Sequence, residues 1–271
     1  MIRVGIGGWT YADWRKNFYP ADLPHARELE YCSRKVTAIE INGTFYRTQK
    51  PESFRRWAAE TPDDFVFTLK APGAVVNRGV LAETGPAIAR FVESGIGELG
   101  AKLGPILWQF APTRRFDPAD IAAFLDMLPR QADGIALRHA LEVRHESFAD
   151  PAFLDLARRA GAAVVHADAA KYPSIADLTG DFVYARLQRS VAAEPAGYPA
   201  AALDLWATRA RAWASGDDPE DLPHIGSTMR DRSGQARPVF VFFISGAKER
   251  NPAAAMALIA RLRDGAPAAE D

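Results

Sequence analysis

Polar side chains that can exchange protons or bind anions stand at the ends of six short apolar runs of this 271-residue sequence. In the segment HALEVRHESF (139–148), an apolar run typical of a buried strand gives way to charged and titratable residues. Residues two apart on a strand point to the same face, so paired positions share one side of a sheet. The side chains at these ends are Glu40 and Asn42, Lys70, Gln109, Glu142 and Arg144, His166 and Asp168, and Arg186 and Gln188.

These residue types favour acid/base chemistry on a small anion. Guanidinium and ammonium groups bind phosphate and carboxylate, so Lys70, Arg144 and Arg186 would hold the negative group. A carboxylate would act as acid or base, assisted by a neighbouring titratable group. The expected substrate is phosphorylated or polyhydroxylated, and the pattern does not rank isomerase, lyase or hydrolase activity. The expected catalytic residues are Glu40, Glu142, His145 and Asp168.

The first loop, GGWTYADWRKNFYP (7–20), is rich in aromatic residues. One interpretation is a hydrophobic plug over one edge of the fold. The other is a wall on which a sugar ring or base stacks, with Arg15 or Lys16 meeting a phosphate. The second interpretation adds Trp9, Tyr11 and Trp14 to the expected substrate-binding residues.

Three other interpretations remain open. The acidic and basic strand ends balance in number, so they could form a purely structural ion-pair network. The protein could bind a ligand without transforming it. It could also process nucleic acid, although the net charge of −1 does not favour this. The basic residues that would then meet phosphates are Arg15, Lys16, Arg47, Arg55 and Arg56.

Cofactor chemistry has little support in the sequence, and no cofactor is predicted. A divalent metal, as in sugar isomerases and endonucleases built on barrels, is possible with Glu142, His166 and Asp168 as ligands. That set is incomplete, because the seventh strand supplies Arg186 and the eighth supplies only Ser245. Glycosidase carboxylates, a G-x-S-x-G elbow, a P-loop and a dinucleotide fingerprint are all missing.

The elements that must position these residues alternate between strand-like and helical runs, which predicts a parallel sheet covered by helices. Eight such units favour a single-domain (β/α)8 TIM barrel over residues 1–265, with a frayed tail at 266–271. The link 169–181 is too short for a full helix, so a shortened crossover is expected between strands six and seven. The predicted strands are 3–7, 38–42, 65–70, 105–110, 140–144, 162–168, 182–187 and 239–244. The predicted helices are 26–35, 52–60, 85–100, 117–128, 151–161, 201–214 and 252–263.

Composition limits the class of protein. The single cysteine, Cys32, excludes an internal disulfide framework and favours a reducing cytoplasm. Neither a secretory signal nor an apolar run long enough for a membrane span is found, so no membrane partner is expected. The oligomeric state is not indicated.

The motifs GGWTYADWRKNFYP, IEINGTFYR, WAAETPDDFVFTLKAP, LGPILWQFAP, EVRHESF and VYARL follow one another in an order that resembles the YecE-like family, domain of unknown function 72. The resemblance implies a TIM barrel and does not imply an activity. The chain departs from the family at Gln188-Arg189, where His-Gly is common, and at ISGAKERN, where an Asn-rich turn is common. The site positions that carry over are Glu40, Asn42, Tyr46, Arg47, Lys70, Gln109, Glu142, Arg144, His145, Asp168 and Arg186.

Overall fold

The predicted apolar runs form parallel strands that curl into a barrel. The protein is described by a computed structural model that covers residues 1–77, 79–226 and 234–264. Within these residues, one nine-stranded sheet has the order β8-β7-β4-β3-β2-β1-β11-β10-β9. The edge strands β8 and β9 are consecutive in the chain and share one barrel position, which brings the two edges of the sheet together. The predicted α/β barrel is therefore confirmed, whereas the predicted tail 266–271 lies outside the described residues.

The barrel strands coincide with the predicted runs to within two residues at most ends. Their bounds are β1 (Ile2–Gly7), β2 (Ala38–Ile41), β3 (Val66–Lys70), β4 (Leu103–Gln109), β7 (His139–Glu142), β8 (Ala163–Val164), β9 (His166–Asp168), β10 (Val183–Leu187) and β11 (Val239–Phe243).

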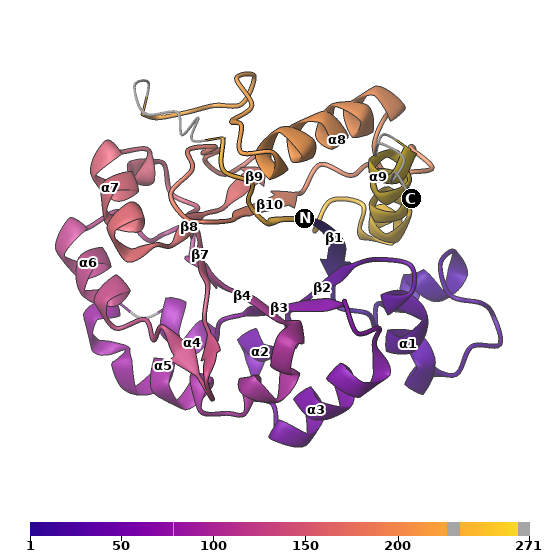
Figure 1. Ribbon diagram of the computed structural model, residues 1–271, viewed down its shortest axis with the longest axis horizontal. Helices are drawn as coiled ribbons and strands as arrows, with labels where there is room; N and C mark the ends of the chain where they lie inside the picture. Colours follow the sequence, from indigo (N-terminus) through magenta and orange to yellow (C-terminus); the bar gives the residue numbers. More distant parts are fainter. Residues whose placement is uncertain (78, 227–233, 265–271) are drawn as a thin grey trace.

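Helices surround the barrel, as the ribbon shows (Figure 1). Two of them begin where the sequence signals it: Asp117 and Asp150 accept backbone hydrogen bonds as N-caps, and a proline follows each at the first helical position. The α-helices are α1 (Glu28–Ser33), α2 (Gly43–Tyr46), α3 (Pro51–Glu60), α4 (Gly73–Val76), α5 (Gly85–Val92), α6 (Pro118–Asp126), α7 (Pro151–Ala160), α8 (Ala200–Ala214) and α9 (Asn251–Asp264). The 3-10 helices are η1 (Ala12–Lys16), η2 (His25–Arg27), η3 (Leu81–Glu83), η4 (Ile96–Lys102), η5 (Glu146–Phe148) and η6 (Lys248–Arg250).

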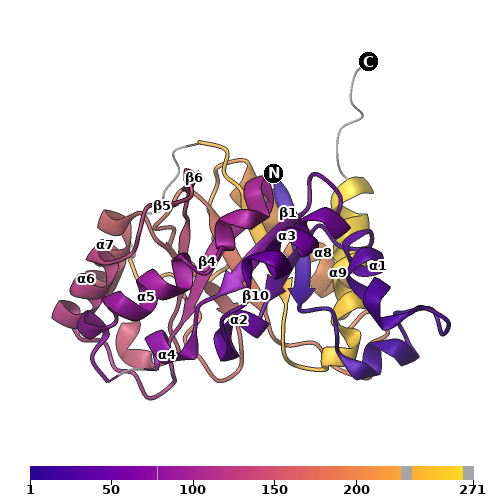
Figure 2. The ribbon, with the colours of Figure 1, turned by 90° about the horizontal axis from the view of Figure 1, so that it is seen from below.

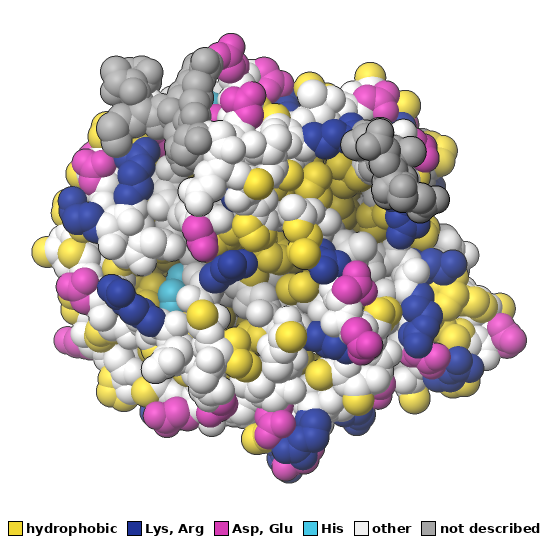
Figure 3. Space-filling model, in the orientation of Figure 1, with side chains coloured by type: hydrophobic (Ala, Val, Ile, Leu, Met, Phe, Trp, Pro, Cys, Tyr) yellow, Lys and Arg dark blue, Asp and Glu magenta, His cyan; other side chains and the backbone are white. Residues whose placement is uncertain are grey.

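The barrel interior is apolar at its amino end and charged at its carboxyl end. Large side chains from β10 and β11, including Tyr184, Phe240 and Phe242, pack there against Leu107 and small alanines. Gly5 lets β1 approach this interior closely, because a Cβ there would lie 2.2 Å from the Ala38 carbonyl oxygen. The short helices α2 and α4 lie at the opposite end of the barrel from the N-terminus (Figure 2). Figure 3 shows the amino-terminal face, with hydrophobic side chains gathered near its centre.

The sixth unit of the barrel differs most from expectation. Val165 interrupts the predicted strand 162–168, and no helix, not even a short one, forms in residues 169–181, all of which are described. Residues 223–226 contact this link instead. Asp177 is buried and accepts hydrogen bonds from the backbone N–H groups of Ile225 (2.7 Å) and Gly226 (3.0 Å). Residues 223–226 of the following unit are therefore hydrogen-bonded to the link that lacks a helix.

Other differences have local causes. The predicted helix 85–100 ends at Val92, because Gly95 adopts a left-handed φ of 98° before η4 begins. The hairpin of β5 (Gln131–Ala132) and β6 (Ile135–Ala136) was not predicted, although its turn at Asp133 and Gly134 has the positive φ values that an Asp-Gly turn favours. Among the described helices, none is both long and hydrophobic enough to span a bilayer.

Candidate active site

A buried ion-pair network crosses the barrel below its mouth. Glu40, at the end of β2, and Glu142, at the end of β7, are fully buried, and Arg186 of β10 lies between them at 2% exposure. Arg186 binds Glu40 through two hydrogen bonds, from Nε to Oε2 (3.0 Å) and from Nη2 to Oε1 (2.9 Å). Its Nη1 donates to Oε2 of Glu142. Charges at this depth require such pairing, because desolvation is costly.

Other polar groups complete the network. The hydroxyl of Tyr184 donates to Oε2 of Glu40 at 2.7 Å and lies 2.9 Å from the hydroxyl of Thr68. Nε2 of Gln109 donates to Oε2 of Glu142 at 3.0 Å, and Nε of Arg144 donates to Oε1 at 2.9 Å. All four carboxylate oxygens of the two glutamates therefore accept at least one hydrogen bond.

This environment holds Glu142 in its ionised form. Burial raises the pKa of Glu142, but the charges of Arg186 and Arg144 and the hydrogen bond from Gln109 outweigh burial and lower it. Neither Glu40 nor Glu142 is among the described residues that line the cavity above. Both carboxylates therefore lie below the cavity lining, where Glu40 binds Arg186 and Glu142 binds Arg186 and Arg144. The acid/base role expected for them stays a prediction.

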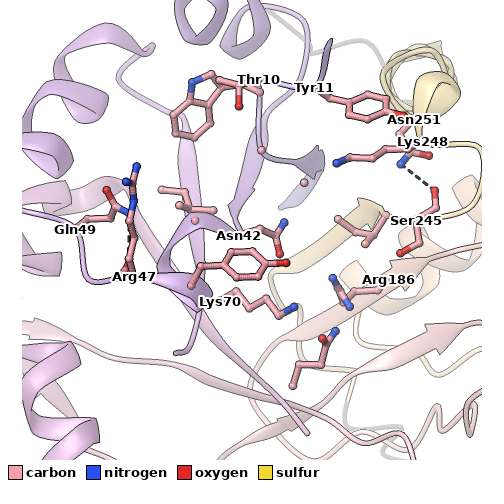
Figure 4. Close-up of a pocket in the computed structure, with 18 of the residues that line it drawn as sticks. Thr10, Tyr11, Asn42, Arg47, Gln49, Lys70, Arg186, Ser245, Lys248 and Asn251 are labelled. Atoms are coloured by element: carbon pink, nitrogen blue, oxygen red, sulfur yellow. Dashed lines mark hydrogen bonds between the residues drawn. The ribbon is translucent and has the colours of Figure 1, made fainter. Parts of the chain in front are cut away.

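Above the network lies a cavity of about 670 Å³ at the carboxyl ends of the strands. Barrel enzymes carry their active sites at this end. Figure 4 shows Lys70 and Arg186 near one another at its base, with Asn42 close by. The lining residues include nine predicted site residues, which are Trp9, Tyr11, Asn42, Tyr46, Arg47, Lys70, Gln109, Arg144 and Arg186.

Lys70 lines this cavity and has a pKa that lies closer to neutrality than that of an ordinary lysine. Burial and the charge of Arg186 lower its pKa to about 8, assisted by Arg144 and opposed by Glu40 and Glu142. Its Nζ lies 4.2 Å from the centre of the Phe45 ring. Within the described part of the chain, Nζ has no hydrogen-bond partner. The amine is therefore available to a bound molecule.

The aromatic loop divides between the site and the core. Trp9 and Tyr11 line the cavity, where Trp9 packs edge-on against Trp57 and Tyr11 lies 4.4 Å from Nζ of Lys248. Trp14 is fully buried, and its Nε1 donates to the Lys248 carbonyl oxygen at 2.8 Å. The prediction that Trp14 contacts substrate is not supported by its position, and for this residue the plug interpretation fits.

His145, His166 and Asp168 do not converge on the cavity. Nδ1 of His145 accepts a hydrogen bond from the Ser147 backbone N–H at 3.1 Å and caps η5. His166 faces outward, where its ring packs against Trp206 and Trp213 of α8. Asp168 shares that outward face and pairs with Arg189 at 2.8 Å. The expectation that both residues face the mouth with Glu142 was wrong, because two-residue spacing fixes a shared face but not which face.

A metal site built from Glu142, His166 and Asp168 is consequently not formed. Glu142 points into the barrel and the other two point toward the outer helices. Across the described residues, no three His, Cys, Asp or Glu side chains are grouped so that they could hold a metal ion.

The loop after β11 supplies site residues that the sequence analysis missed. Ser245, Lys248 and Asn251 line the cavity, and Asn251 donates from Nδ2 to the Ser245 carbonyl oxygen at 3.2 Å (Figure 4). Ser245 has a positive φ of 62°, which is uncommon for a residue other than glycine. The departure of ISGAKERN from the family pattern was the signal that marked this loop.

A second cavity of about 440 Å³ adjoins the first at Arg144, which lines both. The Arg144 guanidinium lies 4.4 Å from the centre of the Tyr172 ring. The remaining residues around this second cavity are His145, Glu146, Ala149, Ala170, Lys171, Tyr172 and Pro173.

Together, the fold and the cavity define an α/β barrel protein with a polar, lysine- and arginine-containing site at the carboxyl ends of its strands. A family model described as "Protein of unknown function DUF72" matches residues 3–270. The chain belongs to the DUF72 family, which confirms the resemblance found in its motifs.

Curated relatives and a solved structure agree with this membership. The chain is 28% identical to the UPF0759 protein YecE of Escherichia coli K12 over 151 residues, which are 55% of this chain and 50% of that protein. It is 26% identical to the UPF0759 protein YunF of Bacillus subtilis over 167 residues, or 57% of this chain and 55% of that one. These matches span about half the length of each relative. A DUF72 family protein from Thermotoga maritima superposes with a TM-score of 0.71 at 20% identity, covering 97% of this chain and 99% of that one, which shows the shared fold.

Proposed function

We propose that the cavity binds a small anionic compound, phosphorylated or polyhydroxylated, and that the protein transforms it by acid/base chemistry with Lys70 as the proton-transferring group. The observation that carries the proposal is that the negative and positive side chains occupy different places in the site. Each carboxylate is buried and accepts three hydrogen bonds, whereas Lys70 and the arginines line the cavity.

The charge balance at the base of the cavity favours an anion. Three positive charges meet there when Lys70 is protonated, those of Lys70, Arg144 and Arg186. Among the described residues, the negative charges that act on Lys70 are those of Glu40 and Glu142. Arg186 uses Nε–H and one N–H each of Nη1 and Nη2 for the glutamates, which leaves two of its five N–H bonds. Arg144 uses only Nε for Glu142, and its terminal nitrogens have no hydrogen-bond partner among the residues described. Guanidinium N–H groups in such an arrangement can bind phosphate or carboxylate oxygens.

Lys70 fits the proton-transfer role better than the carboxylates do. A catalytic acid or base works best when its pKa lies near the working pH, and the pKa of Lys70 is about 8. Amide groups beside it suit a polyhydroxylated substrate, because Asn42 and Gln109 line the same cavity.

Calorimetric titration with inorganic phosphate tests the binding step. We expect saturable binding by the protein, weaker binding by the Arg144→Met variant, and no change in the Arg159→Met variant, whose arginine lies on the exposed side of α7. Absence of saturable binding across anions would contradict the proposal.

A screen of phosphate esters and sugar acids for conversion tests the chemical step. Turnover lost in Lys70→Met, in protein that still binds phosphate, is the expected result. Tight binding without conversion of any ligand would instead identify a non-catalytic binding protein.

A further inference from the structure

We propose that Lys70 is a nucleophile as well as a base, and that its amine forms an imine with the carbonyl carbon of a small aldehyde or ketone that carries a phosphate or carboxylate. This inference rests on the proposed function, because the anionic group would be held by the same arginines.

The surroundings of Nζ distinguish Lys70 from a lysine held for its charge. Lys102 donates to the carbonyl oxygens of Ala58 (2.6 Å) and Thr61 (2.8 Å), so its amine is engaged by the protein itself. Lys16 donates to the carboxylate of Asp13 at 2.6 Å. Lys70 instead has the face of the Phe45 ring at 4.2 Å and no acceptor among the described residues. Its amine faces the cavity without a hydrogen-bond acceptor among the described residues.

The charged groups that face Lys70 from neighbouring strands support a neutral amine. Arg186 comes from β10 and Arg144 follows β7, and both disfavour a further positive charge. Glu40 and Glu142 raise the pKa of Lys70, but their oxygens accept hydrogen bonds from Arg186 and Arg144. A lysine that is desolvated beside other cations is the arrangement that activates an amine for attack on a carbonyl. The pKa of Lys70, lowered to about 8 chiefly by burial, agrees with this.

The covalent step balances without an oxidant or reductant. The neutral Lys70 amine attacks the carbonyl carbon, the C=O π bond breaks, and the carbonyl oxygen takes up the proton that the attacking nitrogen releases, which gives a carbinolamine. Loss of that oxygen as water, with one proton supplied by solvent, leaves a protonated imine between Nζ and the former carbonyl carbon. The positive iminium can then withdraw electrons from a neighbouring carbon–hydrogen or carbon–carbon bond, which defines the class of substrate as one that reacts next to its carbonyl.

Borohydride trapping with a matched pair of aldehydes tests the inference. The protein is incubated with glycolaldehyde phosphate or with uncharged glycolaldehyde, reduced with sodium borohydride, digested, and mapped by mass spectrometry. Reduction converts the imine to a stable secondary amine on the lysine that formed it. We expect saturable modification of Lys70 by the phosphorylated aldehyde, much less with the uncharged one, and inhibition by added inorganic phosphate.

Two variants and one independent measurement make the outcome decisive. Lys70→Arg keeps the positive charge and should lose the modification, while Lys50→Arg removes an exposed lysine outside the cavity and should leave the Lys70 adduct unchanged. Modification spread over exposed lysines without preference for Lys70 overturns the inference. If phosphate binds in the calorimeter but no adduct forms on Lys70, the imine is wrong and the proposed function stands. If phosphate does not bind either, both fall.

Discussion

Arg186 and Glu40 form a bidentate pair in the interior of the barrel, with two hydrogen bonds of 3.0 and 2.9 Å from the guanidinium to the carboxylate. Both side chains are almost completely excluded from solvent. The pair fixes the plane of the guanidinium, and the bond from Nη1 to Glu142 fixes its remaining rotation. The remaining N–H bonds of Arg186 therefore have a defined direction before any ligand arrives, which lowers the entropic cost of binding an anion.

The first prediction concerns the stability of this network. Arg186→Met should lower the free energy of unfolding by about 3–5 kcal/mol, because it leaves two buried carboxylates without their shared partner. Urea unfolding followed by circular dichroism measures the change. Arg47→Met, at an exposed position, should stay within about 0.5 kcal/mol of the parent protein.

A compensated variant separates charge from packing. Adding Glu40→Gln and Glu142→Gln to Arg186→Met removes the unpaired charges and should recover much of the lost stability. A triple variant as unstable as Arg186→Met alone would show that the ion pairs are not what holds this region together.

The second prediction concerns the titration of Lys70. An NMR titration of its ε-carbon should give a midpoint near pH 8, with the neutral amine gaining population as pH rises through that value. Glu142→Gln removes a charge that raises the pKa of Lys70, so the midpoint should move lower. Arg144→Met removes a charge that lowers this pKa, so the midpoint should move higher. Shifts of the same sign in the two variants would contradict the electrostatic account.

The third prediction is a pH dependence of stability that originates at His166. Burial lowers the pKa of His166 to about 4, so the folded protein disfavours the imidazolium that the unfolded chain accepts readily. The stabilisation from the neutral ring is complete above about pH 6.5 and is lost as pH falls toward 4. By linkage this amounts to about 3 kcal/mol. Chemical denaturation measures the free energy of unfolding of the parent and of His166→Leu at several pH values. The difference between the two proteins should change by that amount between pH 6.5 and pH 4. A difference that does not depend on pH would contradict the prediction.

The fourth prediction separates the two roles of the aromatic loop. Trp14→Ala should cost about 3–5 kcal/mol of stability, as expected for a large buried side chain, without a specific effect on phosphate binding by the folded fraction. Tyr11→Ala, at a partly buried position, should cost less stability than Trp14→Ala and weaken binding of a ligand that bears a ring. Calorimetry and thermal unfolding on both variants check this, and the reverse pattern would restore Trp14 to the site.

The sequence predicted the barrel well because alternation of apolar strands and amphipathic helices is a local property of the chain. It also predicted that Glu40, Asn42, Lys70 and Arg186 belong to one end of the barrel. It could not predict which glutamate oxygens accept hydrogen bonds from the arginines, since this depends on distances between strands far apart in the chain. For the same reason the hydrogen-bond partners of Glu142 could not be predicted. His166 and Asp168 were assigned to the wrong face, because two-residue spacing does not say which face a pair takes.

The helix-free link after β9, residues 169–181, affects how easily this part of the barrel wall unfolds locally. A helix would cover this part of the barrel wall with an apolar face. Here the link is held to residues 223–226 by hydrogen bonds from the backbone N–H groups of Ile225 and Gly226 to Asp177, and from that of Ala176 to the Pro223 carbonyl oxygen. Amide protons of β9 should therefore exchange with solvent faster than those of β2 and β3. Because Lys171 and Tyr172 lie in the same helix-free link, beside the second cavity, local opening there would admit or release a ligand past Arg144 while the Glu40–Arg186 pair stays closed.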